Sequence, residues 1–424
     1  MRKTLEQWLT WQETLHLSEI DLGLKRIGQV AKKLNLLHPT FPIITVAGTN
    51  GKGSCVAMLD AILSAEGYTT GSYTSPHLLE YNERIKLKGV NSSDQEIINA
   101  FEQIDKVRDN ISLTYFEFST LAAMLIFSKS KVDVAILEVG LGGRLDAANL
   151  WDASLALITS ISIDHVDWLG DDRDQIAIEK SGIMRKNMPV ISGEIDPPKT
   201  ISGEAKRICA TLYQVNQDYS VSIQDNNSWL WKNDEVSLSL PIPSLAGDFQ
   251  INNAATVVAG LQAIKALLKI SFSSIEQGLS TVSVLGRLQI LSSSPTWLLD
   301  VAHNPDSAKQ LANYLQANPV AGNTRALFSM LTDKNIEQVV ALFDDTIDEW
   351  HIISLDGSRG LSTVELKQRM LQLSFKGKIV SYDDISDAYY SLKNITKSED
   401  RVVAFGSFLV VSSLLNIWKP LHEK

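Results

Sequence analysis

The sequence is poor in cysteine and has no excess of positive charge, and each shortage excludes a class of protein. Only Cys55 and Cys209 occur among its 424 residues, too few for a disulfide framework and without the spacing of a thiolate metal site. A reducing, cytoplasmic location is therefore expected. The formal net charge of −10 argues against a broad nucleic-acid-binding surface, although a local basic pocket could still bind an anionic ligand.

Long apolar segments are also missing from the sequence. Glu6 and Gln7 stand where a signal peptide would begin its apolar core. The late apolar stretch 402–411 contains Gly406 and Ser407 and is shorter than the ~20 residues of a membrane-spanning helix. We therefore expect no membrane partner and no nucleic-acid partner, and we expect a monomer that acts on small molecules.

Hydrophobic and charged residues, at 44% and 21% of the sequence, are as frequent as in ordinary globular proteins, and the length suits two or three domains. From residue 43 onward, short β-branched segments alternate with amphipathic ones, a pattern that predicts parallel sheets covered by helices. The pattern restarts near Arg287. We therefore expect an α/β protein with a larger P-loop-type parallel-sheet domain at 1–286 and a smaller Rossmann-like α/β domain at 287–424.

The individual elements can be placed from the same periodicity. The expected strands are 43–47, 132–139, 155–160, 297–301, 325–329, 350–354, 379–382 and 401–405, and the clearest helices are 54–65 and 306–317. The polar stretch 224–235, together with Pro241 and Pro243, predicts loops or hairpins inside the first domain.

A glycine-rich loop, Gly-Thr-Asn-Gly-Lys-Gly-Ser at 48–54, connects the first expected strand to a helix. Backbone N–H groups at such a helix start can surround phosphates while a lysine neutralises them. The spacing differs from G-x-x-x-x-G-K-[ST], because Gly53 separates Lys52 from Ser54. A purely structural glycine turn is the alternative, but Lys52 and Ser54 in this position favour the binding of ATP phosphates.

Five motifs carry a resemblance to a known enzyme family. The segment Thr-Asn-Gly-Lys-Gly-Ser at 49–54 resembles the loop of the Mur-ligase superfamily. Four further segments resemble the folylpolyglutamate synthase family: Tyr-Thr-Ser-Pro-His-Leu at 73–78, Thr-Tyr-Phe-Glu at 114–117, the glycine-rich run 137–149, and Asp-Val-Ala-His-Asn-Pro at 300–305. They occur in the family's order over nearly the whole chain.

The resemblance implies an ATP-dependent acid–amino-acid ligase of folate biosynthesis. In such an enzyme the γ-phosphoryl group of ATP passes to a carboxylate, and the amine of L-glutamate attacks the acyl phosphate. Arg-Leu-Asp-Ala-Ala-Asn at 144–149 and Ile-Asp-Leu-Gly at 20–23 look more like the bifunctional members. Those members add glutamate to dihydropteroate and, as γ-linked polyglutamate, to tetrahydrofolates.

The resemblance also implies the nucleotide contacts. The family's ATP-binding positions fall on Thr49, Asn50, Gly51, Lys52, Gly53, Ser54, Asn253, Arg287 and Asp300. Asn253 resembles an adenine-side asparagine at a helix start. Phe249 stands where the family often has histidine, so we leave it outside the site. Without the family, Arg287 would be interpreted as a helix-capping or surface arginine.

Three residues are candidates for catalysis, namely Lys52, Lys180 and His303. His303 and Asp300 begin the first strand-to-helix turn of the second domain, and the resemblance places them facing the nucleotide. Lys180 lies on an expected helix and alone would be interpreted as a surface lysine. Proteins of the family carbamylate the lysine at this position, which turns a cation into an anionic group that can position a metal ion.

Mg²⁺ is the metal that the resemblance implies, at two sites, and a monovalent cation is a further candidate. The γ-phosphoryl charge must be neutralised when an acyl phosphate forms, so oxygen and imidazole ligands should lie near the phosphate loop. The family's ligand set falls on Ser75, Glu138, His165 and Lys180. We expect Glu138 and His165 at the C-terminal ends of strands, where parallel sheets bind ligands. An isolated serine or histidine is otherwise more often structural.

For the acceptor, the resemblance points to Asp21, Thr114, Tyr115, Phe116, Glu117, Leu145, Asp146 and Ala147. A flat pterin ring suits an aromatic platform and a carboxylate that pairs with its N–H groups, roles that fit Phe116 and Asp146. Without the family, Phe116 would be interpreted as a core residue, because the stretch 115–127 is apolar.

Three other functions are considered. The first is a folylpolyglutamate synthase without the dihydropteroate activity. The second is another Mur-type amide ligase, such as a cell-wall enzyme, which would carry a further domain before the phosphate strand. The third belongs to a different class, a regulatory ATP-binding protein that uses the loop as a switch; the set Glu138, His165, Lys180 and Asp300 argues against it.

Overall fold

The computed structural model describes residues 3–224, 227–357, 359–373 and 377–422. The chain divides into two compact units, each with its own sheet. Unit 1 comprises Met1–Ser244 and Gln250–Ser283, and unit 2 comprises Leu245–Phe249 and Val284–Lys424. The segment 245–249, which we expected in the first domain, thus belongs with the second unit.

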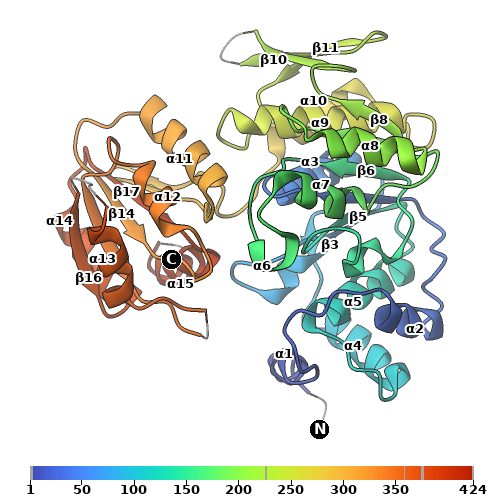
Figure 1. Cartoon of the computed structure of the whole chain (residues 1–424), viewed down its shortest axis with the longest axis horizontal. Coiled ribbons are helices and arrows are strands. Elements are labelled where there is room, and N and C mark those ends of the chain that lie inside the picture. The colour runs from blue at the N-terminus through green and yellow to red at the C-terminus, as the bar shows by residue number, and fades with distance from the viewer. Residues whose placement is uncertain (1–2, 225–226, 358, 374–376, 423–424) are drawn as a thin grey trace. The chain divides into compact units, whose positions relative to one another are not determined.

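Unit 1 is built on an eight-stranded sheet with the order β4-β3-β2-β5-β1-β6-β7-β8 (Figure 1). Its strands are β1 (Ile43–Ala47), β2 (Thr70–Tyr73), β3 (Ile85–Leu87), β4 (Val90–Asn91), β5 (Val134–Glu138), β6 (Leu155–Ile158), β7 (Pro189–Ser192) and β8 (Thr211–Gln214). The six strands from β2 to β8 are parallel, whereas β3 and β4 add an antiparallel edge. The expected parallel-sheet domain is confirmed, with an unexpected antiparallel margin.

Helices cover the sheet of unit 1. They are α1 (Leu5–Glu13), α2 (Lys25–Lys33), α3 (Lys52–Ala65), α4 (Asp94–Arg108), α5 (Tyr115–Ser130), α6 (Val166–Leu169), α7 (Arg173–Ser181), α8 (Lys199–Ile208), α9 (Phe249–Ala263) and α10 (Phe272–Thr281), with 3₁₀ turns η1 (Tyr81–Arg84) and η2 (Ala147–Leu150). Strand β1 has the bounds that the sequence predicts, and α3 begins two residues before the expected helix.

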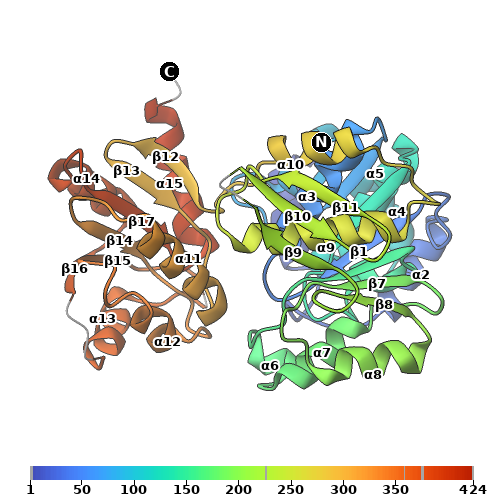
Figure 2. The same cartoon turned by 90° about the horizontal axis from the view of Figure 1, so that it is seen from above.

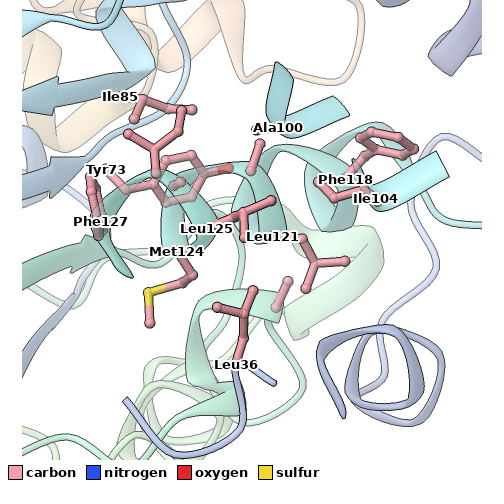
Figure 3. Close-up of a cluster of buried hydrophobic side chains, with 14 of the residues drawn as sticks. Leu36, Tyr73, Ile85, Ala100, Ile104, Phe118, Leu121, Met124, Leu125 and Phe127 are labelled. Atoms are coloured by element: carbon pink, nitrogen blue, oxygen red, sulfur yellow. The ribbon is translucent and has the colours of Figure 1, made fainter. Parts of the chain in front are cut away.

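The main core of unit 1 packs α1, α2, α4 and α5 against the sheet. Figure 3 shows part of this cluster, with Phe118, Leu121 and Met124 of α5 among its labelled side chains. Leu137 of β5 belongs to this cluster, whereas Val139 packs with α7 and α8. Alternate residues of a strand point to one face, so α5 and α7 cover the same side of the sheet.

A separate three-stranded antiparallel sheet lies after β8 in the chain. It has the order β11-β10-β9 and consists of β9 (Ser220–Ile223), β10 (Ser228–Lys232) and β11 (Ser237–Pro241) (Figure 2). The hairpins expected around 224–235 and Pro241 are thus confirmed within the described residues.

Unit 2 contains a six-stranded sheet with the order β12-β13-β17-β14-β15-β16. Its elements are β12 (Gln289–Ser293), β13 (Thr296–Leu299), α11 (Pro305–Ala317), β14 (Thr324–Phe328), α12 (Ile336–Ala341), β15 (Glu349–Ile353), α13 (Thr363–Leu371), β16 (Lys378–Tyr382), α14 (Ile385–Ile395), β17 (Arg401–Phe405) and α15 (Phe408–His422). All five expected strands are found, each within two residues of its expected bounds. Strand β12, which we did not predict, pairs antiparallel to β13.

None of the helices in the described ranges is long and apolar enough to cross a membrane.

Candidate functional site

Strand β1 lies between β5 and β6, which both come later in the chain. A crevice forms at the carboxyl ends of parallel strands where connections leave in opposite directions, and such crevices bind ligands. The loop Gly48 to Ser54 follows β1, and Glu138 is the last residue of β5. The topology of unit 1 therefore brings the phosphate loop and Glu138 to one edge of the sheet.

The phosphate loop is held by the segment after β6. Thr49 N–H donates to the Ser160 carbonyl at 2.7 Å, Asn50 N–H donates to Ser160 Oγ at 3.1 Å, and Thr159 Oγ1 donates to the Asn50 carbonyl at 2.6 Å. These bonds occupy the first N–H groups of the loop. In the first turn of α3, the N–H groups of Gly53 and Ser54 point out of the helix start and can bind an anion.

Gly51 allows Asn253 to approach this loop. The residue has a φ of 87°, and a Cβ added to it would lie 2.5 Å from Asn253 Oδ1. The Asn253 amide in turn donates to Gln250 Oε1 at 2.9 Å. Only glycine can adopt this conformation and also leave room for the asparagine. Asn253, implied as an adenine-side residue, thus lies against the phosphate loop, in the second turn of α9.

Two lysines converge on one carbonyl oxygen of the loop. Lys52 Nζ donates to the carbonyls of Gly48 and Thr49 at 3.0 Å each, and Lys180 Nζ donates to the Gly48 carbonyl at 2.9 Å. Lys180 is only 4% exposed, so its interpretation as a surface lysine is wrong. Burial first, and then the charge of Lys52, lower the pKa of Lys180 to about 7, while Asp164 and Asp146 oppose the shift.

Glu138 and Ser75 are neighbours at the same sheet edge. Ser75 N–H donates to Glu138 Oε2 at 3.2 Å, and a Cβ added to Gly53 would lie 3.7 Å from the same oxygen. Ser75 follows β2, which adjoins β5. The Glu138 carboxylate therefore lies beside the loop that would hold the phosphates, with Ser75 next to it, as a Mg²⁺ site that also uses phosphate oxygens requires.

His165 does not lie where the sequence predicts. Strand β6 ends at Ile158, well before His165. His165 is instead the N-cap residue of the short helix α6, with a φ of 53°. Its N–H donates to Asp164 Oδ1 at 2.8 Å. Within the described part of the chain, no three or more His, Cys, Asp or Glu residues are grouped so that they could hold a metal ion. A metal here would need the Ser75 hydroxyl and oxygens of the substrate.

The N-terminus of α5 carries four of the expected acceptor residues. Thr114 N–H donates to Glu117 Oε2 at 2.8 Å, and Glu117 N–H donates to Thr114 Oγ1 at 3.2 Å, which forms a capping box. This T-x-x-E signal is readable in the sequence. Thr114 and Glu117 therefore fix the helix start that presents Tyr115 and Phe116.

Glu117 also belongs to an ion-pair network that sequence reasoning missed. Arg26 Nη2 donates to Glu117 Oε1 at 3.2 Å, Arg26 Nη1 donates to Asp21 Oδ2 at 2.5 Å, and His16 Nε2 lies 3.1 Å from that oxygen. Burial raises the pKa of Glu117, whereas Arg26 and the Thr114 N–H lower it. Arg26 thus ties the segment that contains Asp21 to the start of α5.

The glycine-rich segment after β5 contacts the segment that contains Asp21. Gly23 N–H donates to the Leu145 carbonyl at 3.1 Å. The Asp146 carboxylate accepts the N–H groups of Leu141 and Ala148, each at 2.9 Å, and is 1% exposed. Burial raises the pKa of Asp146 to about 7. Its carboxylate therefore organises the turn that contains Leu145 and Ala147.

Phe116 lies between the core and this turn. A Cβ added to Gly140 would be 2.7 Å from Phe116 Cζ, and the rings of Phe116 and Tyr73 are 5.8 Å apart. Phe116 is half-buried, unlike the fully buried Phe118 two residues later. Its partial exposure distinguishes it from the core side chains of α5.

In unit 2, Asp300, His303 and Arg287 gather where β13 ends. The Asp300 carboxylate accepts the N–H groups of Leu288 at 2.9 Å and Ala302 at 2.8 Å, and burial raises its pKa against the opposing charge of Arg287. His303 Nδ1 donates to the Val301 carbonyl at 2.8 Å, since a carbonyl can only accept.

Arg287 lies over an aromatic ring of the same unit. Its guanidinium carbon is 5.5 Å from the ring centroid of Phe408, and the ring of His303 is 5.9 Å from the same ring. Arg287 is therefore neither a helix cap nor a fully exposed side chain. Phe249 packs against the core of unit 2, and we keep it outside the site.

Comparison with known proteins gives matches over both units. The Mur ligase middle domain matches residues 46–261, and the Mur ligase glutamate ligase domain matches residues 286–408. The dihydrofolate synthase/folylpolyglutamate synthase of Escherichia coli K12 is 39% identical over 414 residues, which span 97% of this chain and 95% of that protein. The Haemophilus influenzae protein of the same name is 40% identical over 427 residues, with 96% of each chain covered.

Solved structures show the same likeness. E. coli FolC in complex with DHPP and ADP has a TM-score of 0.93 and 38% identity, over 99% of this chain and 98% of that one. The bifunctional Yersinia pestis enzyme complexed with AMPPNP and Mn ion has a TM-score of 0.91 and 42% identity, over 98% of each chain.

Proposed function

The chain belongs to the dihydrofolate synthase/folylpolyglutamate synthase family of Mur ligases, and on this basis we propose that it uses ATP to add L-glutamate to two acceptors. The first acceptor is dihydropteroate and the second is tetrahydrofolate, whose polyglutamate tail grows through γ-linked amides. One observation carries the proposal. The phosphate loop, the paired lysines and Glu138 meet at one sheet edge in a chain that matches both ligase domains over nearly its full length.

The ATP phosphates are bound by the start of α3 and by Lys52. The N–H groups of Gly53 and Ser54 lie at the positive end of that helix, and the ammonium of Lys52 adds a full charge. Thr49 and Asn50 shape the loop through their bonds to Ser160. Asn253 lies beside Gly51, where it can contact the nucleotide. Arg287 and Asp300, which unit 2 brings together by itself, are the family's other nucleotide-binding positions.

Mg²⁺ would be held by Glu138 and Ser75, with His165 and Lys180 completing a second site and a monovalent cation as a further candidate. The pairing of Ser75 with the Glu138 carboxylate beside Gly53 fits an ion that keeps waters and phosphate oxygens as its other ligands. When bound, the metal neutralises the charge of the transferred phosphoryl group.

Lys180 suits carbamylation because of where its amine lies. The side chain is buried and its Nζ donates to the Gly48 carbonyl at 2.9 Å, close to a second ammonium. An uncharged amine attacks CO₂ to form a carbamate and releases a proton. The product would carry a negative charge next to Lys52 and would remove the repulsion between the two cations.

The reaction has two steps. The acceptor carboxylate takes the γ-phosphoryl group and ADP leaves; the glutamate amine then attacks the acyl phosphate and displaces phosphate. Lys52 stabilises the charge that develops on the phosphates. His303 is the candidate base for the amine proton, because its Nδ1 donates to Val301 and leaves Nε2 as the acceptor in the neutral ring.

The acceptor's pterin would lie on Phe116, near the turn organised by Asp146. Thr114 and Glu117 fix the helix start that presents Tyr115, and Leu145 and Ala147 belong to the turn. Asp21 is connected to the helix start through Arg26, and the nearby Gly23 bonds to Leu145. We also propose that the protein works as a monomer in the cytoplasm, with no nucleic-acid partner, which size-exclusion chromatography and fractionation would test.

One assay tests the function. The purified chain is incubated with ATP, Mg²⁺ and radiolabelled glutamate, with dihydropteroate in one reaction and tetrahydrofolate in another, and the products are separated by chromatography. We expect label in both products. Label only with tetrahydrofolate would indicate a folylpolyglutamate synthase alone, and ATP hydrolysis with label in neither product would contradict the proposal and favour a regulatory ATP-binding protein.

A further inference from the structure

Arg84 is a buried cation that the nucleotide, metal and pterin assignments do not use. It is the last residue of η1 and is 9% exposed. Its Nε donates to His77 Nδ1 at 2.8 Å. Its guanidinium carbon lies 5.6 Å from the ring centroid of Tyr81 and 5.4 Å from that of Tyr115. Burying a charge is costly unless it is compensated.

Its immediate surroundings compensate this charge only in part. Faces of aromatic rings attract a cation weakly, and His77, which accepts at Nδ1, is neutral in this arrangement. The neighbouring Glu83 is occupied, because its carboxylate accepts the N–H groups of Leu78, Leu79 and Glu80 at 2.8 to 2.9 Å. No carboxylate in the described ranges forms an ion pair with Arg84.

The outer nitrogens of Arg84 remain open. Neither Nη atom has a hydrogen-bond partner among the residues that the structure describes, and neither is among the fully buried atoms that lack one. Both therefore retain contact with solvent. Two parallel N–H donors on a plane fixed by His77 and two rings match the geometry of a carboxylate, and little side-chain freedom would be lost on binding.

Arg84 touches both ends of the acceptor site. Its backbone carbonyl accepts the N–H of Thr74 at 2.9 Å, and the next residue, Ser75, donates its N–H to Glu138 Oε2 at 3.2 Å. On its other side is Tyr115, the residue before Phe116. An acceptor with its pterin on Phe116 and its reacting carboxylate near Glu138 would span the two segments that Arg84 contacts.

We propose that Arg84 binds the α-carboxylate of the glutamate that a folate acceptor already carries. The inference rests on the proposed function. Tetrahydrofolate has two carboxylates at its reacting end, the γ-carboxylate that is activated and the α-carboxylate that is not. Dihydropteroate has only the carboxylate that is activated. Arg84 is therefore a specificity residue for the second reaction and is dispensable for the first.

The test compares the full-length wild-type chain with Arg84→Met and Arg84→Lys, using both acceptors. In Arg84→Met we expect the KM for tetrahydrofolate to rise about 10- to 100-fold, the effect of losing a charged hydrogen-bonded pair. The KM for dihydropteroate should change less than about threefold, and Arg84→Lys should recover part of the loss because it keeps the charge. Retained dihydrofolate synthesis also shows that the variant is folded.

A second arm uses the tetrahydrofolate analogue whose α-carboxylate is replaced by a carboxamide. Wild-type protein should bind the analogue about as poorly as Arg84→Met binds tetrahydrofolate, and Arg84→Met should not distinguish the two ligands, as coupled partners behave in a double-mutant cycle. Equal losses for both acceptors in a folded variant overturn the proposal. So does a wild-type protein that does not distinguish carboxylate from carboxamide, a result that needs no variant. Wild-type protein that glutamylates neither acceptor contradicts the proposed function instead.

Discussion

Lys52 and Lys180 donate to the same oxygen, the carbonyl of Gly48, at 3.0 and 2.9 Å. Two ammonium groups that share one acceptor repel each other, and burial strengthens the repulsion because the local dielectric constant is low. The pair is tolerable in the protein if one lysine is uncharged or is converted to an anion. The shared carbonyl therefore implies that Lys180 is neutral or modified, which its position on a helix would not indicate by itself.

Replacing Lys180 by alanine should lower glutamate-dependent ADP formation at least about 100-fold, as expected for the loss of a charged group that acts in the transition state. Lys265→Ala is the matched control, because among the described residues Lys265 of unit 1 forms its ion pair with the exposed Glu235. If Lys180 is carbamylated, removing bicarbonate should reduce wild-type activity, and a short carboxylate such as acetate should restore part of the activity of Lys180→Ala. Full activity of Lys180→Ala would contradict the assignment.

Gly51→Ala should abolish ATP binding while the chain stays folded. The new Cβ would lie 2.5 Å from Asn253 Oδ1 at a φ of 87°, so the loop and the asparagine cannot both keep their positions. Calorimetric titration with ATP would measure the loss. Gly203→Ala is the control: this glycine lies within α8 with nothing within 4 Å of an added Cβ, and the change should leave ATP binding intact and stabilise the fold by up to about 1 kcal/mol. ATP affinity unchanged in Gly51→Ala would show that the loop is not the phosphate site.

The sequence predicted the elements whose hydrophobic pattern is strong. Strand β1 has five buried residues and a glycine after it, and its predicted and observed bounds agree. Strand β12 was missed because it lies at a sheet edge and alternates polar residues with the exposed Ile290. Helix α1 was missed although Thr4 and Gln7 form a capping box, a signal that the sequence contains.

The site was predicted less completely, because several of its contacts join residues far apart in the chain. The burial of Lys180 depends on the carbonyl of Gly48, 132 positions earlier, and periodicity within α7 cannot show it. Arg26 and Arg84 lie outside the motifs, and His77, although it belongs to the motif at 73–78, gives no sign there of its bond to Arg84. Their functions depend on partners such as Glu117 and Tyr115, which only the folded chain brings near.

Asp60 gives a prediction on stability and pH. Its carboxylate is buried and accepts hydrogen bonds from the hydroxyls of Thr70 and Ser72, and burial raises its pKa above the usual value near 4. The folded state then holds a proton that the unfolded state releases. The contribution of Asp60 to stability is therefore full below the unfolded pKa and is lost as the pH rises through the folded pKa.

Asp60→Asn removes this dependence and keeps the size of the side chain. Urea unfolding of both proteins at several pH values should show that Asp60→Asn gains stability relative to wild type as the pH rises from about 4 to neutral. A difference that stays constant with pH would mean that the pKa of Asp60 is the same in the folded and unfolded states.

Glu138→Gln tests the metal assignment with minimal change of shape. The amide oxygen can still accept the Ser75 N–H, a bond of 3.2 Å in the wild type, but the negative charge that binds a divalent cation is gone. We expect glutamate-dependent ADP formation to fall at least about 100-fold, and the Mg²⁺ concentration for half-maximal activity to rise. Glu235→Gln removes the same charge from an exposed ion pair with Lys265 and should behave as wild type. Wild-type turnover and an unchanged Mg²⁺ requirement in Glu138→Gln would exclude Glu138 as a ligand. Among the described residues, no other acidic side chain hydrogen-bonds to Ser75 and could replace Glu138 there.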